Sequence, residues 1–232
     1  LLITLWIRAK LNESPVFRQL EESGTKEKTP VAAVFRTSWR QMLVGVLAAL
    51  LGTAGFYIVT SFIMNYGTRV LGIEKDVVLG ATMVGAVFQL GAVIHAGRLG
   101  KRLGASKVII WSGIAGALVA FPCLLLVQTT EPLLVVVGVV IGLVTLTYSF
   151  AATGSVLTGL FASSVRLTGV SLTYNTCNIL AGLTPLISTA LVTWASDHWW
   201  PAAVLLVIFS LASALGGLLA PKLSQQYEDY TH

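Results

Sequence analysis

The chain has little charge, and that charge is absent from long parts of the sequence. Of its 232 residues, 11% are charged and 55% are hydrophobic, and the mean hydropathy is +0.82. Soluble domains carry about 25% charged residues, which argues against a soluble fold. Six stretches hold no Asp, Glu, Lys or Arg: 41–64, 77–97, 108–130, 132–154, 167–193 and 199–220.

Each of these stretches is long enough to cross a bilayer, which takes a helix of about 20 apolar residues. Backbone polar groups inside lipid must be bonded within the protein, and runs of this length indicate helices rather than barrel strands. The sequence therefore predicts an all-α, polytopic membrane protein with six spans.

The chain also lacks the residues that metal sites and most enzymes need. Its two cysteines, Cys123 and Cys177, lie inside apolar spans, where isolated cysteines pack as small residues. No cluster has metal-ligand spacing, and no glycine loop is built to hold a phosphate. The spans contain no paired carboxylates and no Ser/His pair. We therefore expect no metal, no cofactor and no intramembrane enzyme activity.

The basic residues are distributed unevenly between the loops. With six spans, thirteen of the fifteen Lys and Arg residues fall on one side of the membrane, and only Arg69 and Lys75 on the other. The positive-inside rule makes the thirteen-residue side cytoplasmic, which places the C-terminus there. The net charge of +5 is thus explained by topology, and we expect a lipid bilayer and no nucleic acid as the surroundings.

The order of segments predicts half of a longer protein. We expect residues 1–9 to end a preceding helix, 10–40 to form a cytoplasmic connector with short helices (one over 31–39), 41–221 to form a six-helix bundle and 222–232 to form a short cytoplasmic tail. Two six-helix halves joined by a cytoplasmic loop are the architecture of the major facilitator transporters. The expected partner is an N-terminal six-helix half. A truncated, non-transporting fragment is the alternative.

Three segments resemble the metabolite:proton symporter family of that superfamily. Residues 8–17 are similar to the pattern R-x-x-L-x-E-[ST]-P-x-F, and residues 97–104 to G-x-x-x-D-R-x-G. Residues 166–175 resemble R-x-[ST]-G-x-S-x-x-Y-N. The resemblance implies a secondary transporter of the inner membrane that moves a small metabolite together with protons by alternating access.

The resemblance also implies gating roles at the cytoplasmic surface for Gly97, Arg102, Gly104 and Arg166. For Arg166, a simple topology anchor is an equal alternative. Lys101 departs from the family, because it stands where the loop pattern has Asp. In the family, that Asp lies near helix N-termini and helps to hold a gate closed, a role that a Lys cannot take. We expect the tight turn to persist without the charge relay.

Polar side chains inside the spans are candidates for substrate binding. On the fifth span, the two asparagines lie on one helical face, which a tyrosine adjoins. We expect six such side chains to line a cavity that hydrogen-bonds a small polar solute: Tyr57, Gln89, Tyr148, Tyr174, Asn175 and Asn178. In the alternative, the amides join neighbouring helices, and hydroxyls such as those of Thr53 and Thr60 bond their own i−4 carbonyls.

No acidic residue lies inside a span, and His95 is the only ionisable residue there apart from tyrosine and cysteine. Proton coupling by the usual route needs a group that titrates inside the membrane. His95 lies close to Gly97 and the basic loop, which favours an interfacial histidine. We therefore expect the proton carrier, and any cation for a substrate carboxylate, in the N-terminal half.

The family resemblance implies two classes of substrate: organic acids such as citrate and shikimate, and zwitterions such as proline and betaine. A long C-terminal coiled coil would favour an osmosensing proline/betaine porter, whereas here only residues 222–232 follow the last span. We therefore expect an organic acid, with an osmoprotectant symporter as the alternative.

Overall fold

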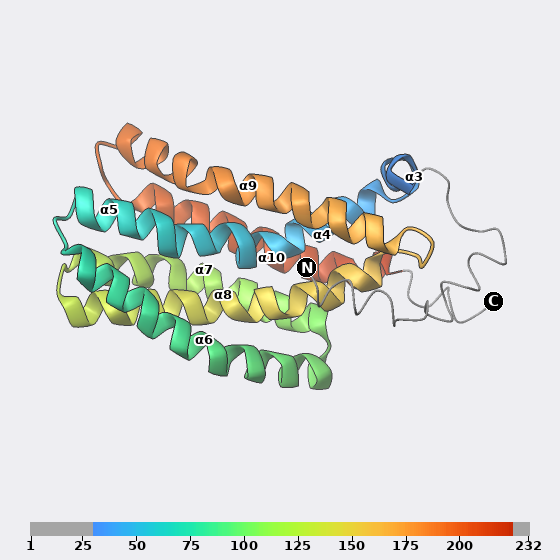
Figure 1. The fold of residues 1–232 in the computed structure, drawn as a ribbon, viewed down its shortest axis with the longest axis horizontal. Helices are drawn as coiled ribbons and strands as arrows, with labels where there is room; N and C mark the ends of the chain where they lie inside the picture. Colours follow the sequence, from blue (N-terminus) through green and yellow to red (C-terminus); the bar gives the residue numbers. More distant parts are fainter. Residues whose placement is uncertain (1–29, 225–232) are drawn as a thin grey trace, which may run out of the picture.

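The computed structural model describes residues 30–224, which form a bundle of long antiparallel helices (Figure 1). The expectations for residues 1–9, for most of the connector and for most of the tail lie outside the described part. Six helices in the described part are long and apolar enough to cross a membrane, as predicted. They are Trp39–Arg69, Lys75–Leu103, Ala105–Gln128, Pro132–Leu160, Arg166–Trp194 and Trp200–Leu223.

The first span is composite, whereas each of the other five is one α-helix. It consists of α4 (Trp39–Leu50), two π-helical segments, η1 (Leu51–Gly55) and η2 (Ile58–Phe62), and α5 (Ile63–Arg69). The short helix α3 (Pro30–Thr37) precedes it, where the sequence predicts one over 31–39. The remaining spans are α6 (Lys75–Leu103), α7 (Ala105–Gln128), α8 (Pro132–Leu160), α9 (Arg166–Trp194) and α10 (Trp200–Leu223).

The turn between α6 and α7 is shorter than the sequence indicates. A loop over 97–107 is expected from its charges and glycines, but this expectation is wrong, because both helices continue to Gly104. The Gly104 N–H donates to the Gly100 carbonyl at 2.9 Å, and its φ of +93° suits a residue without a side chain. The helical backbone hydrogen bonds continue beyond the apolar core of each span, so the charged residues near the turn are also helical.

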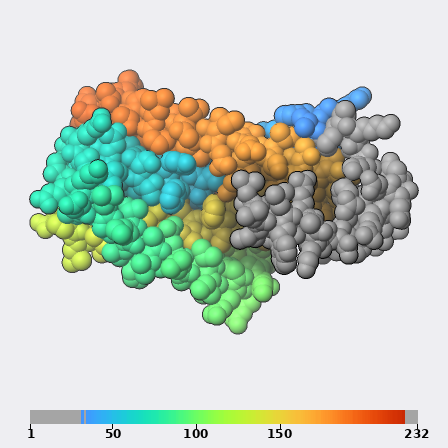
Figure 2. Space-filling model, in the orientation of Figure 1, coloured from blue at the N-terminus to red at the C-terminus, as the bar shows by residue number. Residues whose placement is uncertain are grey.

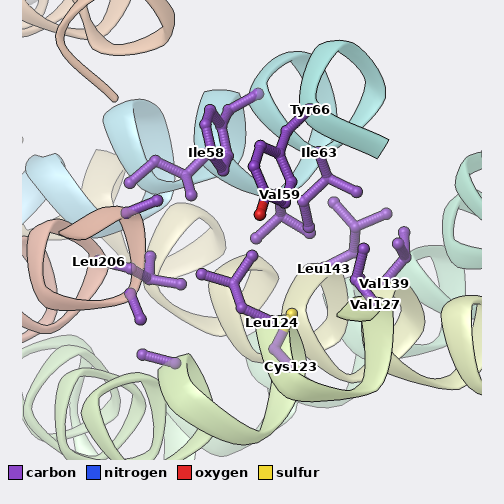
Figure 3. Packing of buried hydrophobic residues seen from close by; sticks show 14 of the residues in the cluster. Ile58, Val59, Ile63, Tyr66, Cys123, Leu124, Val127, Val139, Leu143 and Leu206 are labelled. Carbon is purple, nitrogen blue, oxygen red and sulfur yellow. The ribbon is translucent and has the colours of Figure 1, made fainter. Parts of the chain in front are cut away.

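The first span lies at the centre of the bundle. Of its most apolar window 72% is buried inside the protein, against 22% for α6, which lies at an edge (Figure 1). Figure 3 shows Ile58, Val59 and Ile63 of this span packed against side chains of α7 and α8. The central position of the first span lets it contribute to a site together with helices on either side of it.

Small residues bring the helices close together, as the Gly138-x-x-x-Gly142 pair on α8 suggests. A Cβ at Gly138 would lie 2.8 Å from the Cys123 carbonyl oxygen, and one at Gly142 would lie 3.1 Å from the Cys123 sulfur. The Cys123 thiol donates to the Gly138 carbonyl at 3.1 Å. Cys123 thus packs as a small residue between α7 and α8.

Candidate functional site

A cavity of about 530 Å³ opens between the first span, α6, α8 and α9. Figure 2 shows these elements on one face of the molecule, with the first span between α9 and α6. This volume lies within the usual range for small-molecule sites, about 300–1,000 Å³. The hydrogen-bonding side chains in its wall are those of Thr53, Tyr57, Gln89, Thr147, Tyr174 and Asn178.

Four of the six predicted binding residues meet in this cavity. Tyr57, Gln89, Tyr174 and Asn178 each line it, and they come from three different spans. The remainder of the lining is mostly apolar and includes the rings of Phe56 and Phe150. No Asp, Glu, Lys, Arg or His is among the described residues of the wall. The cavity therefore offers hydrogen bonds and aromatic surface without a formal charge.

Gln89 is held in the wall by a chain of hydrogen bonds. Its amide nitrogen donates to the Thr147 hydroxyl at 2.8 Å, which in turn donates to the Leu143 carbonyl at 2.8 Å. The bond between Gln89 and Thr147 joins α6 to α8 and limits the rotation of the carboxamide. Sequence reasoning did not single out Thr147, because a hydroxyl bonded to its own helix is common inside membranes.

Tyr57 lies between the two π-helical segments and is 38% exposed. The π-helix is rare and often marks functional sites, because its i→i+5 bonds shift the side chains that follow. Here the wall receives Gly52, Thr53, Phe56 and Tyr57 from this part of the first span. The apolar pattern of the run gives no sign of π-helical bonding, so the sequence did not predict it.

Two hydroxyls of the first span bond the i−4 carbonyls of their own helix, as the alternative interpretation of the sequence predicts. Thr53 donates to the Ala49 carbonyl at 2.8 Å, and Thr60 donates to the Phe56 carbonyl at 2.7 Å. The Thr53 oxygen also lies 2.9 Å from the sulfur of Cys177, a buried free thiol on α9. This contact ties the first span to α9 beside the cavity.

Asn175 does not line the cavity, although it lies one turn from Asn178. The Asn175 amide is exposed and donates to the Ser171 carbonyl of its own helix at 2.9 Å. Asn178 is the asparagine of α9 that reaches the cavity wall.

Tyr148 lies outside the cavity lining and contacts His95 on α6. Its hydroxyl is 2.8 Å from His95 Nδ1, and the two rings meet edge to face with centroids 5.7 Å apart. The sequence marked His95 as interfacial and gave no partner for it, because the pairing depends on how α6 packs against α8.

The four residues with predicted gating roles lie at the end of the bundle that holds the α6–α7 turn. Gly104 forms that turn, whereas Gly97 and Arg102 are exposed on the last turns of α6. Arg166 begins α9, and its Nε donates to the Phe161 carbonyl at 3.1 Å. This bond holds the start of α9 against the end of α8.

Comparison with known proteins shows which curated proteins the chain is similar to. Over 220 residues the chain is 31% identical to the inner membrane metabolite transport protein YhjE of Escherichia coli, covering 91% of this chain and 48% of that protein. The chain is 26% identical to the shikimate transporter of Escherichia coli, over 93% of this chain and 50% of that protein. It is also 26% identical to the citrate-proton symporter of Klebsiella pneumoniae, over 92% of this chain and 47% of that protein. By sequence, this chain is similar to curated metabolite transporters.

The curated proteins to which the chain is similar include more than one class of transporter. A proline/betaine transporter of Salmonella typhimurium is 25% identical over 219 residues, which is 89% of this chain and 43% of that protein. A comparison with family models finds no match, and neither does a comparison with solved structures. The chain spans about half the length of the curated relatives it matches. Six spans in the described part are what one half of a twelve-helix fold requires.

Proposed function

We propose that the chain is the C-terminal six-helix half of a secondary transporter that moves a small organic acid with protons. The observation that carries this proposal is the cavity, in which Tyr57, Gln89, Tyr174 and Asn178 converge from three spans. In alternating access, a solute site lies near the middle of the membrane between the two halves of the protein. This chain then supplies one wall of that site, and the N-terminal half supplies the other.

The chemistry of the wall divides the work between the halves. Its described residues offer hydroxyl and amide groups but no cation for a carboxylate and no carboxyl group to carry a proton. The charged groups of the coupling reaction therefore belong to the N-terminal half. The present chain, the C-terminal half, orients the uncharged part of the solute and excludes water around it. The shikimate transporter and the citrate-proton symporter among the relatives support an acid as the solute.

The proposed setting is the inner membrane, with the C-terminus and the α6–α7 turn in the cytoplasm. The thirteen-to-two distribution of basic residues supports this orientation. Gly97, Arg102, Gly104 and Arg166 then lie at the cytoplasmic gate.

A matched pair of asparagine variants tests the binding site. Asn178→Ala and Asn175→Ala remove the same side chain from α9, three residues apart, but only Asn178 lines the cavity. A hydrogen bond to the solute contributes roughly 0.5–1.5 kcal/mol, so Asn178→Ala should raise the half-saturation concentration by about 2- to 12-fold. Uptake by the complete protein in proteoliposomes with an imposed pH gradient measures this. Equal effects of the two changes would refute the assignment of the cavity.

A specific observation favours the osmoprotectant alternative. Four aromatic residues, Phe56, Tyr57, Phe150 and Tyr174, line the cavity. Aromatic faces attract quaternary ammonium groups, and such rings recognise methylated amines elsewhere. Competition by unlabelled glycine betaine and citrate for uptake separates the two functions: inhibition by citrate alone supports the acid, and inhibition by betaine alone supports the osmoprotectant.

A further inference from the structure

A second cavity, of about 840 Å³, lies at the end of the bundle where α6 ends and α7 begins. Residues of α6, α7, α8 and α10 surround it, so four helices of this chain form its walls. We refer to it as the α6–α7 cavity. It shares no lining residue with the candidate substrate cavity, although Gly97 and Gly104, for which gating roles are proposed, also line it.

Small and hydroxyl-bearing residues make room for a ligand there. Gly97 and Gly100 on α6 line the cavity, and a Cβ built on either of them would meet no neighbouring atom within 4 Å. The hydroxyl-bearing residues Ser106, Ser155 and Thr158 line the same space. The cavity is therefore both open and able to hydrogen-bond.

The charge of the lining is entirely positive among the described residues. Lys101 near the end of α6 and Lys107 in the first turn of α7 both line the cavity and are exposed. No Asp or Glu is among the described lining residues. The acidic residues of the described part lie in or next to the loops at the other end of the spans: Glu74, Asp76, Glu131 and Asp197. Two ammonium groups around one open space attract an anion.

The start of α7 adds to this positive field. Residues 105–107 form its first turn and line the cavity, and this turn contains no acidic residue. The N-cap is Gly104, which has no side chain to accept a bond from the first N–H groups of the helix. Unbonded N–H groups and the helix dipole favour an anion at this position. Lys101 strengthens the effect, because it places a cation where the related loop pattern has Asp.

We propose that the α6–α7 cavity binds the phosphate group of an anionic phospholipid. The cavity lies where two spans end, at the level at which acyl chains give way to headgroups. Lys101, Lys107 and the first N–H groups of α7 bind the phosphate oxygens, and the nearby hydroxyls bind the polar part of the headgroup. Leu103, which lines the cavity and is 44% exposed, contacts the acyl chains. Basic pockets between membrane helices hold such headgroups in other proteins.

Lipid titration of the complete protein tests the proposal. Delipidated protein in detergent is titrated with dioleoyl phosphatidylglycerol or with dioleoyl phosphatidylcholine, and bound lipid is counted by native mass spectrometry. Each lysine near a headgroup is expected to contribute about fivefold in affinity, so Lys101→Gln with Lys107→Gln should weaken phosphatidylglycerol binding about 30-fold. The matched control, Arg69→Gln with Lys75→Gln, removes two cations at the other end of the spans and should leave binding unchanged.

A second variant tests the space rather than the charge. Gly100→Leu fills open volume in the cavity wall and should weaken phosphatidylglycerol binding with the lysines intact. The proposal is overturned if both lipids bind equally well, or if the double lysine variant binds phosphatidylglycerol as the unaltered protein does. Displacement of phosphatidylglycerol by millimolar inorganic phosphate would assign the cavity to the free anion and overturn its assignment to lipid.

Discussion

Among the described glycines, Gly216 on α10 is the one at which an added Cβ would come closest to another span. A substitution at this position therefore tests the helix packing directly. A Cβ on Gly216 would lie 2.7 Å from the Ala48 Cα atom on α4 and would also meet the Ala48 nitrogen. Both are backbone atoms, so no side chain can rotate out of the way. The Ser213 hydroxyl, one turn earlier on α10, donates to the Ala48 carbonyl at 2.8 Å.

The cost of Gly216→Ala follows from these contacts. Carbon atoms in contact lie about 3.5–4.0 Å apart, so the two helices must separate by about 1 Å. Overpacking of this kind costs typically 1–3 kcal/mol, and the rigid backbone places it near 3. Loss of the Ser213 hydrogen bond adds about 1 kcal/mol, and the better helix propensity of Ala returns about 1. We expect a net loss of about 3 kcal/mol, or about 100-fold in the unfolding equilibrium.

Unfolding of the purified complete protein by SDS in mixed micelles, followed by tryptophan fluorescence, measures this loss. The matched control is Gly80→Ala on α6, where a Cβ meets no atom within 4 Å. That change should be neutral or stabilise the protein by up to about 1 kcal/mol. If Gly216→Ala is as stable as the unaltered protein, the close packing of α10 on α4 is wrong.

Three further predictions concern the turn, the cavity and the orientation. Gly104→Ala should lower the unfolding free energy by about 1–3 kcal/mol because φ is +93°, whereas Gly97→Ala should not; equal losses would argue against the turn. Asn178→Cys should react rapidly with a membrane-impermeant thiol reagent, whereas Ser188→Cys, fully buried on α9, should not; comparable rates would contradict the placement of α9. A reporter at Ser106 should read cytoplasmic, and a periplasmic reading would reverse the topology.

The number and position of the spans are local properties, and the sequence was sufficient for them. A helix in lipid satisfies its backbone within its own segment, so each uncharged run specifies its own structure whatever its neighbours do. Most helices begin and end within a few residues of these runs, but three spans continue five or six residues beyond theirs, to Arg69, Leu103 and Leu160. The close contact at Gly138 and Gly142 fits the same local logic, because small residues at i and i+4 expose backbone to a neighbour.

Which side chains line the cavity depends on how the helices pack. Asn175 and Asn178 look alike in the sequence, but the rotation of α9 against the first span brings only Asn178 to the wall. His95 and Tyr148 pair because α6 lies against α8, and nothing in the sequence near either residue predicts this contact. The π-helical turns around Tyr57 likewise leave no periodic signal, since a shift of one hydrogen bond changes the direction of side chains without changing the apolar run. Contacts between spans are set by the whole bundle, and only the tertiary structure decided them.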